Sequence, residues 1–126
     1  MTDRELLKTA LDASLRAYAP YSGFTVGAAL ECEDGSVVTG CNVENAAYGE
    51  CICAERTAVV KAVSEGKTAF RRIAVYGPGK SYCMPCGACR QVLSEFSPEM
   101  EVLCARADGA YVSYPLNKLL AYTFKL

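Results

Sequence analysis

Helical and strand-like periods alternate along this chain, and their order limits the folds that it can adopt. Apolar residues recur at helical spacing in segments that predict helices over 3–18, 53–65 and 86–96. Runs rich in β-branched and aromatic residues predict strands over 24–32, 36–43, 71–77, 101–107 and 110–114. A short last helix is expected over 115–122, opening at Pro115. This order predicts an α/β layer sandwich with a mixed sheet.

Three local signals mark the boundaries of these elements. Thr2 and Glu5 form a capping box ahead of the first helix. Asp34-Gly35 predicts a tight primed hairpin turn between the first two strands, because glycine accepts a positive φ without strain. Gly66 follows the last apolar residues of the second helix and predicts its end.

Length and charge narrow the classes of partner. No linker or repeat divides the 126 residues, so residues 1–126 are expected to form a single domain. The formal net charge is -1, and there is no basic stripe of the kind that binds nucleic acid. No stretch reaches the ~20 apolar residues of a membrane-spanning helix, and no signal-peptide core follows Met1. We therefore expect a cytoplasmic protein with neither a membrane nor a nucleic-acid partner.

Cysteine restricts the chemistry more than any other residue type. The chain holds 8 cysteines and no histidine, so a metal site would depend on thiolates and carboxylates. In a reducing cytosol, cysteines indicate metal or redox sites rather than disulfides. Cys32 and Cys104 lie inside apolar runs and are expected to be buried bystanders.

The segment SYCMPCGACRQ, residues 81–91, contains two overlapping C-x-x-C pairs. Proline disfavours the helical conformation in the residue before it, so the helix should begin at or just after Pro85. Cys86 and Cys89 then stand three residues apart in the first helical turn, close enough to share a metal. The alternative pair, Cys83 with Cys86, is separated by an extended residue and would suit a thiol–disulfide oxidoreductase.

The remaining ligands are expected just before the second helix, where a helix N-terminus stabilises a thiolate. Spacing alone leaves two sites open. One is a closed structural zinc with ligands Cys51, Cys53, Cys86 and Cys89, although structural sites usually place two to four residues between paired cysteines. The other is an open site without Cys51, in which water completes the coordination and Glu55 takes its proton. Taken alone, Glu55 is better explained as an acid that is favoured at a helix N-terminus.

The second arrangement carries a resemblance to a known family. Cys53-Ala-Glu55, followed by Pro85-Cys86-Gly-Ala-Cys89, resembles the zinc nucleobase deaminase signature. Two further stretches, APYSGFTVGAA at 19–29 and GCNVENAAY at 40–48, extend the resemblance to the small homotetrameric cytidine deaminases. The similarity runs from about residue 4 to residue 95.

This resemblance implies a three-layer sandwich with a mixed five-stranded sheet and helices on both faces. It also implies one Zn²⁺ per chain, ligated by Cys53, Cys86 and Cys89, with Glu55 as proton shuttle. The implied reaction is hydrolytic deamination of cytidine and 2'-deoxycytidine to uridine and 2'-deoxyuridine, with release of ammonia, as in pyrimidine salvage. The partners implied are a nucleoside and three further copies of the chain. Blasticidin-S deaminases share both zinc motifs and are the alternative.

Other residues match substrate-site positions of the family. The matches imply that Phe24 contacts the base ring and that Asn42 and Glu44 bind the ribose hydroxyls. The N–H of Ala54 would bind the pyrimidine carbonyl, and the carbonyl of Met84 would bind the leaving amine. The residues matched to the shared subunit interface are Ala46, Tyr48 and Phe124. Arg56 matches an arginine that hydrogen-bonds the thiolates and offsets their negative charge. Without the resemblance, Phe24 would be assigned to the core, Asn42 and Glu44 to a turn, and Arg56 to the solvated surface.

Overall fold

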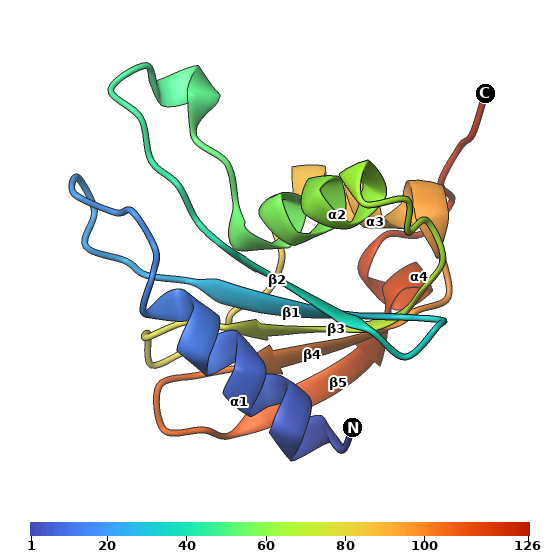
Figure 1. The fold of residues 1–126 in the computed structure, drawn as a ribbon, viewed down its shortest axis with the longest axis horizontal. Coiled ribbons are helices and arrows are strands. Elements are labelled where there is room, and N and C mark those ends of the chain that lie inside the picture. The colour runs from blue at the N-terminus through green and yellow to red at the C-terminus, as the bar shows by residue number, and fades with distance from the viewer.

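A computed structural model describes all 126 residues and places five strands in one sheet (Figure 1). The strands are β1 (Gly27–Cys32), β2 (Val37–Cys41), β3 (Phe70–Tyr76), β4 (Glu101–Ala105) and β5 (Tyr111–Pro115). The helices are α1 (Asp3–Ser14), α2 (Ala54–Ser64), α3 (Gly87–Phe96) and α4 (Leu116–Leu119), with a 3-10 turn at Tyr48–Glu50. None of these helices is long and apolar enough to cross a membrane.

The sheet is mixed, as the sequence predicts. Its strand order is β2-β1-β3-β4-β5, and only β3 and β4 run parallel. A parallel pair needs a crossover connection, and here α3 supplies it between the two strands. The chain that leaves the carboxyl end of β3 therefore enters α3, which is the helix that carries two of the predicted zinc ligands.

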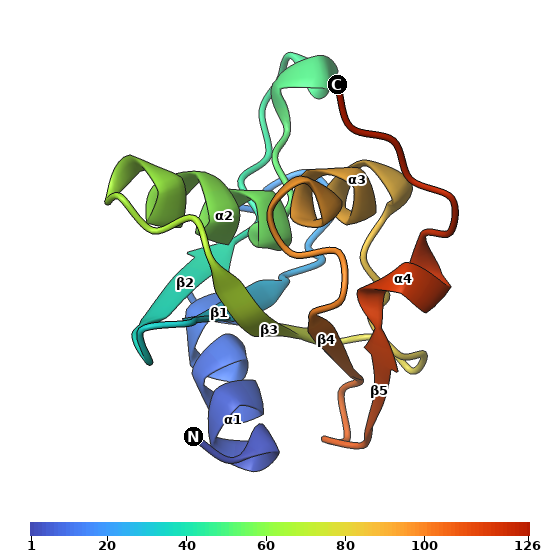
Figure 2. The ribbon, with the colours of Figure 1, turned by 90° about the vertical axis from the view of Figure 1, so that its right-hand side faces the viewer.

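The helices lie in two layers on opposite faces of the sheet (Figure 2). On one face α1 packs alone, with Leu6, Leu7 and Ala10 against Ala29, Ala74 and Leu103 of the sheet. The other face carries α2, α3 and α4 over a larger core of 16 buried residues, among them Val59, Leu93 and Leu116. The three-layer sandwich with helices on both faces is thus confirmed.

Two glycines let these helices approach the strands closely. A Cβ atom on Gly27 of β1 would stand 1.9 Å from the carbonyl oxygen of Ala10 in α1. A Cβ atom on Gly40 of β2 would stand 2.4 Å from the carbonyl oxygen of Ala54 and 2.5 Å from the nitrogen of Ala58. Backbone therefore packs on backbone at both places, and Gly40 sets the position of the start of α2.

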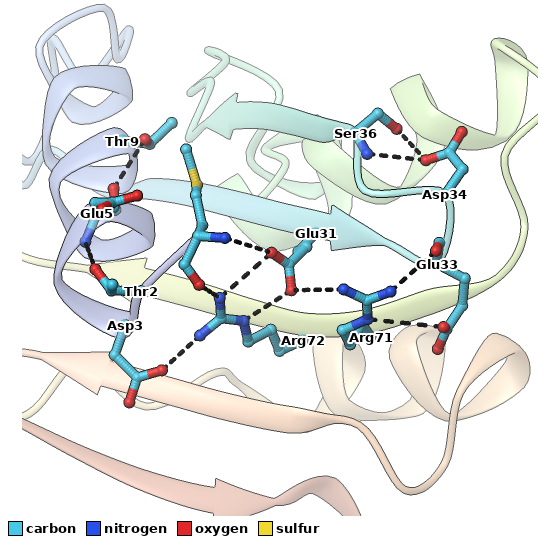
Figure 3. Close-up of polar contacts among 11 residues, drawn as sticks. Thr2, Asp3, Glu5, Thr9, Glu31, Glu33, Asp34, Ser36, Arg71 and Arg72 are labelled. Carbon is cyan, nitrogen blue, oxygen red and sulfur yellow. Dashed lines mark hydrogen bonds and ion pairs between the residues drawn. The ribbon is translucent and has the colours of Figure 1, made fainter.

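A buried ion pair joins the N-terminal segment to the sheet (Figure 3). Glu31 of β1 is almost completely buried and accepts a hydrogen bond from Nε of Arg72 in β3 at 2.8 Å. Arg72 also donates to Asp3 at 2.5 Å and to the carbonyl oxygen of Met1. The guanidinium of Arg72 lowers the pKa of Glu31, so this buried carboxylate stays ionised.

Several predicted boundaries and one predicted turn type were wrong. The first strand begins at Gly27 rather than at residue 24, and the last helix ends at Leu119 rather than at residue 122. The first helix ends at Ser14 rather than near Tyr18, because the backbone of Tyr18 pairs with the segment after β2: its N–H donates to Asn42 and its carbonyl accepts from Glu44. The predicted primed turn is a three-residue loop instead, since Gly35 alone has positive φ, at 88°, and Asp34 does not. The cap of α1 is confirmed in the hydrogen bond from the N–H of Glu5 to the Thr2 hydroxyl, and the end of α2 before Gly66 is confirmed as well.

Candidate active site

Three cysteines converge where the first turns of α2 and α3 face one another. Cys53 and Cys86 are the N-cap residues of these helices, and Cys89 lies in the first turn of α3. The Sγ atoms of Cys53 and Cys86 are 3.8 Å apart, and those of Cys86 and Cys89 are 3.5 Å apart. All three sulfurs lie within 4.8 Å of one another.

The environment of this cluster favours negative charge on sulfur. The neighbouring Cys89 thiol and the guanidinium of Arg56 together lower the pKa of Cys53 to about 5. The proximity of Cys53 and burial raise the pKa of Cys89. Nη2 of Arg56 donates to Cys53 Sγ at 3.4 Å. Arg56 therefore lies against the thiols, as the resemblance implies, rather than on the solvated surface.

These residues fit a zinc ion. Three close thiolates are soft ligands of the kind that zinc prefers, and a three-ligand protein set leaves one tetrahedral position for a water or a substrate. A divalent cation would also offset the repulsion between three thiolates brought so close together. The buried Nε of Arg56 has no hydrogen-bond partner within the chain, and it lies on the side chain that already donates to Cys53.

Neither alternative set of cysteines is brought together. Cys51 does not belong to the cluster of three sulfurs and instead accepts a hydrogen bond from the N–H of Asn45 at 3.4 Å. A closed four-cysteine site is therefore not formed. Cys83 also lies outside the cluster, packed so close to Gly77 that a Cβ there would meet its sulfur at 2.7 Å. Burial raises the pKa of Cys83 to about 12, which makes it a poor redox nucleophile.

Glu55 is a buried carboxylate in the first turn of α2. Its exposed fraction is 4%, although charged side chains are rarely so buried without a partner. Burial raises its pKa to about 7, and the nearby charge of Cys53 adds to this rise. A carboxyl group held in this way can both accept and donate a proton near neutral pH.

A cavity of about 790 Å³ opens next to the cluster, between two segments that are distant in the sequence. One wall is the loop with Tyr21 and Ser22, and the other is an arm, residues 42–53, that projects from the body of the molecule (Figure 1). Cys53 and Arg56 also belong to the lining of the cavity. Its lining includes four residues of the predicted substrate site: Asn42 and Glu44, which were assigned to the ribose, and Ala46 and Tyr48, which were assigned to the shared interface.

Asn42 and Glu44 are held firmly in the cavity wall. Asn42 uses its side-chain amide twice, accepting from the N–H of Val26 at 2.8 Å and donating to the carbonyl oxygen of Phe24 at 2.9 Å. Glu44 accepts from the backbone N–H groups of Tyr21 and Ser22 at 2.9 and 3.2 Å. These contacts fix the orientation of both side chains. Residues that only formed a turn would not need such a fixed orientation.

Phe24 is not a core residue, because 44% of its surface is exposed. Its ring lies against the loop after β3, where a Cβ on Gly79 would meet a ring carbon at 3.4 Å. It does not line the large cavity, and neither does Phe124, which is 72% exposed in the C-terminal segment. Ala54 is buried at the first position of α2, where a backbone N–H has no partner within the helix. Tyr48 is 90% exposed at the tip of the arm.

Sequence reasoning missed the contribution of the loop before β1. Ser22 donates to Glu44 and accepts from Phe24, and so contacts two predicted site residues at once. No spacing rule signals this, since 22 residues separate Ser22 from Glu44. The available signal was Ser22 itself, which lies within the motif 19–29 but has no periodic or capping role in it.

The sequence matches the family described as the cytidine and deoxycytidylate deaminase zinc-binding region over residues 1–105. It is 47% identical over 124 residues to a cytidine deaminase of Halalkalibacterium halodurans, which covers 97% of this chain and 94% of that protein. A cytidine deaminase of Sporosarcina psychrophila is 44% identical, covering 98% and 92%. A blasticidin-S deaminase of Bacillus cereus is more distant, at 29% identity over 126 residues.

Solved structures with a similar fold are also cytidine deaminases. The crystal structure of cytidine deaminase from Burkholderia pseudomallei superposes with a TM-score of 0.95 at 46% identity, covering 98% of this chain and 100% of that one. Cytidine deaminase from Mycobacterium tuberculosis gives a TM-score of 0.85 at 40% identity, with complete coverage of both chains.

Proposed function

The chain belongs to the zinc-dependent cytidine deaminases, and from this premise we propose that it hydrolyses cytidine and 2'-deoxycytidine to the corresponding uridines with release of ammonia. The observation that carries the proposal is the cluster of Cys53, Cys86 and Cys89 beside the buried carboxylate of Glu55. One domain, residues 1–126, would perform the reaction.

Cys53, Cys86 and Cys89 would hold one Zn²⁺ per chain, and the cation would supply a Lewis acid that acidifies the attacking water. Glu55 accepts a proton from that water and delivers it to N3 of the cytosine ring while the water oxygen bonds to C4. Glu55 then moves the remaining hydroxyl proton to the exocyclic amine, which leaves as ammonia. The product keeps the proton on N3 and the carbonyl at C4, so the atoms balance as nucleoside plus water.

The remaining residues orient the nucleoside and support the thiolates. Asn42 and Glu44 bind the ribose hydroxyls from the cavity wall. Phe24 lies outside the lining of this cavity and would pack on the base from the adjacent loop. The free N–H of Ala54 donates to the pyrimidine carbonyl, and the carbonyl of Met84 accepts from the amine. Arg56 offsets the charge of the thiolates through its hydrogen bond to Cys53. A nucleotide phosphate would be repelled by Glu44, so a nucleoside is the preferred substrate.

A substrate panel tests this proposal. Zinc-loaded protein should convert cytidine and 2'-deoxycytidine, measured by the loss of their ultraviolet absorbance, and should leave cytidine 5'-monophosphate and blasticidin S largely unchanged. Conversion of blasticidin S in preference to cytidine would contradict the proposed substrate.

We further propose that four chains assemble and share their sites. The cavity is only partly enclosed by this chain, and the projecting arm exposes Tyr48 where a neighbouring chain could cover it. Ala46 and Tyr48 of the arm, together with Phe124, would then close a neighbour's site. Light scattering should give the mass of a tetramer, and a fully active monomer would contradict this assembly.

We place the enzyme in the cytoplasm, because all eight cysteines are free thiols.

A further inference from the structure

Ser22 connects two residues that are assigned to nucleoside binding. Its hydroxyl donates to Oε2 of Glu44 at 2.5 Å and accepts from the backbone N–H of Phe24 at 3.0 Å. A serine hydroxyl has only one hydrogen to donate, and here the carboxylate takes it. One side chain therefore ties the carboxylate in the arm to the backbone of the aromatic residue in the loop.

We propose that Ser22 is a positioning residue, which sets the orientation of the Glu44 carboxylate and thereby the affinity of the enzyme for the sugar of its substrate. This inference rests on the proposed function, because it takes Glu44 as the group that binds a ribose hydroxyl.

The acceptor capacity of Glu44 supports this role. An ionised carboxylate offers about four acceptor positions on its two oxygens. The loop fills both positions of Oε1 through the N–H groups of Tyr21 and Ser22, and the Ser22 hydroxyl fills one of Oε2. One position on Oε2 remains for a ligand. Ser22 thus leaves Glu44 with one free acceptor position, whose direction is fixed. One hydroxyl group of a sugar could donate to it.

The loop that carries Ser22 is built to hold it in place. The N–H of Gly23 donates to the carbonyl oxygen of Ala19 at 2.9 Å, and Gly23 has a positive φ of 70° that other residues rarely adopt. The N–H of Glu44 donates to Tyr18 at 2.8 Å, so the loop and the arm are joined on both sides of the carboxylate. The Ser22 hydrogen bond also lowers the pKa of Glu44, which keeps the carboxylate ionised and able to accept.

Replacing the hydroxyl tests the proposal. In Ser22→Ala, the KM for cytidine should rise about tenfold, since a hydrogen bond to a charged group is lost, while kcat should change by less than about twofold, because the sugar is bound equally in the ground and transition states. The matched pair Ser22→Thr and Ser22→Val differs only in the hydroxyl. Ser22→Thr should retain most of the affinity and Ser22→Val should lose it, which keeps the test decisive if Ser22→Ala folds poorly. Ser64→Ala, at the exposed end of α2, is the control for losing a surface hydroxyl.

Inhibition by products separates positioning from a general effect on the loop. The inhibition constant of uridine should rise in Ser22→Ala by the same factor as KM, whereas that of 2',3'-dideoxyuridine, which lacks both ring hydroxyls, should stay within about twofold of the parent value. An equal rise for both inhibitors, or no rise for either, would overturn the proposal. A parent enzyme that fails to deaminate cytidine would instead contradict the proposed function, so the two failures are distinguishable.

Discussion

Glu55 is buried beside the thiol cluster, and its replacement is the sharpest probe of the proposed proton transfers. Glu55→Gln preserves the shape of the side chain but cannot accept a proton from water. We expect kcat to fall by more than about 10³-fold, because the same group acts in more than one step. Zinc content, measured by mass spectrometry, and the unfolding temperature should stay close to those of the parent.

Glu65→Gln provides the matched control for this variant, since Glu65 stands exposed at the end of the same helix. It should retain full activity. Near-normal turnover by a zinc-replete Glu55→Gln protein would show that another group moves the protons.

Among the elements, α2 depends most closely on a single small residue. Because Gly40 has no side chain, the first turns of α2 rest directly on β2. Gly40→Ala should force the helix outward and lower the free energy of unfolding by about 1–3 kcal/mol, the usual cost of overpacking. The displacement should also weaken zinc retention, because Cys53 caps this helix. Urea denaturation and chelator competition measure the two effects.

Gly49→Ala is the matched control, because a Cβ at Gly49 meets no atom within 4 Å and its φ is not positive. It should change the free energy of unfolding by less than about 0.5 kcal/mol. If Gly40→Ala were equally neutral, the close approach of α2 to β2 would not be what positions Cys53.

The sequence predicted those elements that depend on local interactions. Pro85 and the i, i+3 spacing were enough to place Cys86 and Cys89 together at the start of one helix, because both are short-range features, although Cys86 is the N-cap rather than a member of the first turn. The pairing of Tyr18 with Asn42 and Glu44, by contrast, shortens α1 through contacts between distant segments. No periodicity within residues 3–18 could reveal that contact, and the same is true of the bond from Ser22 to Glu44.

The proximity of Cys53 to the cysteines of α3 was only partly predictable from the sequence. Spacing placed each thiol at a helix start, but it left Cys51 and Cys83 as possible partners. Only the sheet, which brings the starts of α2 and α3 together, selects Cys53, Cys86 and Cys89. The family resemblance anticipated this choice, whereas physical reasoning from the residues alone did not.

Across the whole molecule, the ion pair of Glu31 and Arg72 ties α1 to the centre of the sheet (Figure 3). Arg72→Met would leave the buried Glu31 with only two weaker partners, Arg71 and the terminal amine, at 3.9 and 3.8 Å. We expect a loss of about 3 kcal/mol at neutral pH, the lower end for breaking a buried pair.

The pH dependence of this loss follows from the pKa of Glu31, which is lowered from 4.5 in the folded protein. A lowered carboxyl pKa stabilises the fold above the unfolded value, and that stabilisation disappears as the pH falls through the folded value. The difference between parent and Arg72→Met in urea denaturation should therefore be full above pH ~5 and shrink below it. A difference independent of pH would contradict the role of the charge. Lys8→Met, which removes an exposed pair with Asp12, should cost less than about 0.5 kcal/mol throughout.

The most direct test of the whole arrangement is a zinc titration of metal-free protein. Zinc would be removed with a chelator under reducing conditions and then added back in steps, while cytidine conversion is followed by ultraviolet absorbance. Three thiolates per chain and one open position predict that activity is absent without metal, rises linearly with added zinc, and saturates at one equivalent per chain. Activity that survives complete removal of zinc, or saturation well away from one equivalent, would contradict a catalytic zinc held by Cys53, Cys86 and Cys89.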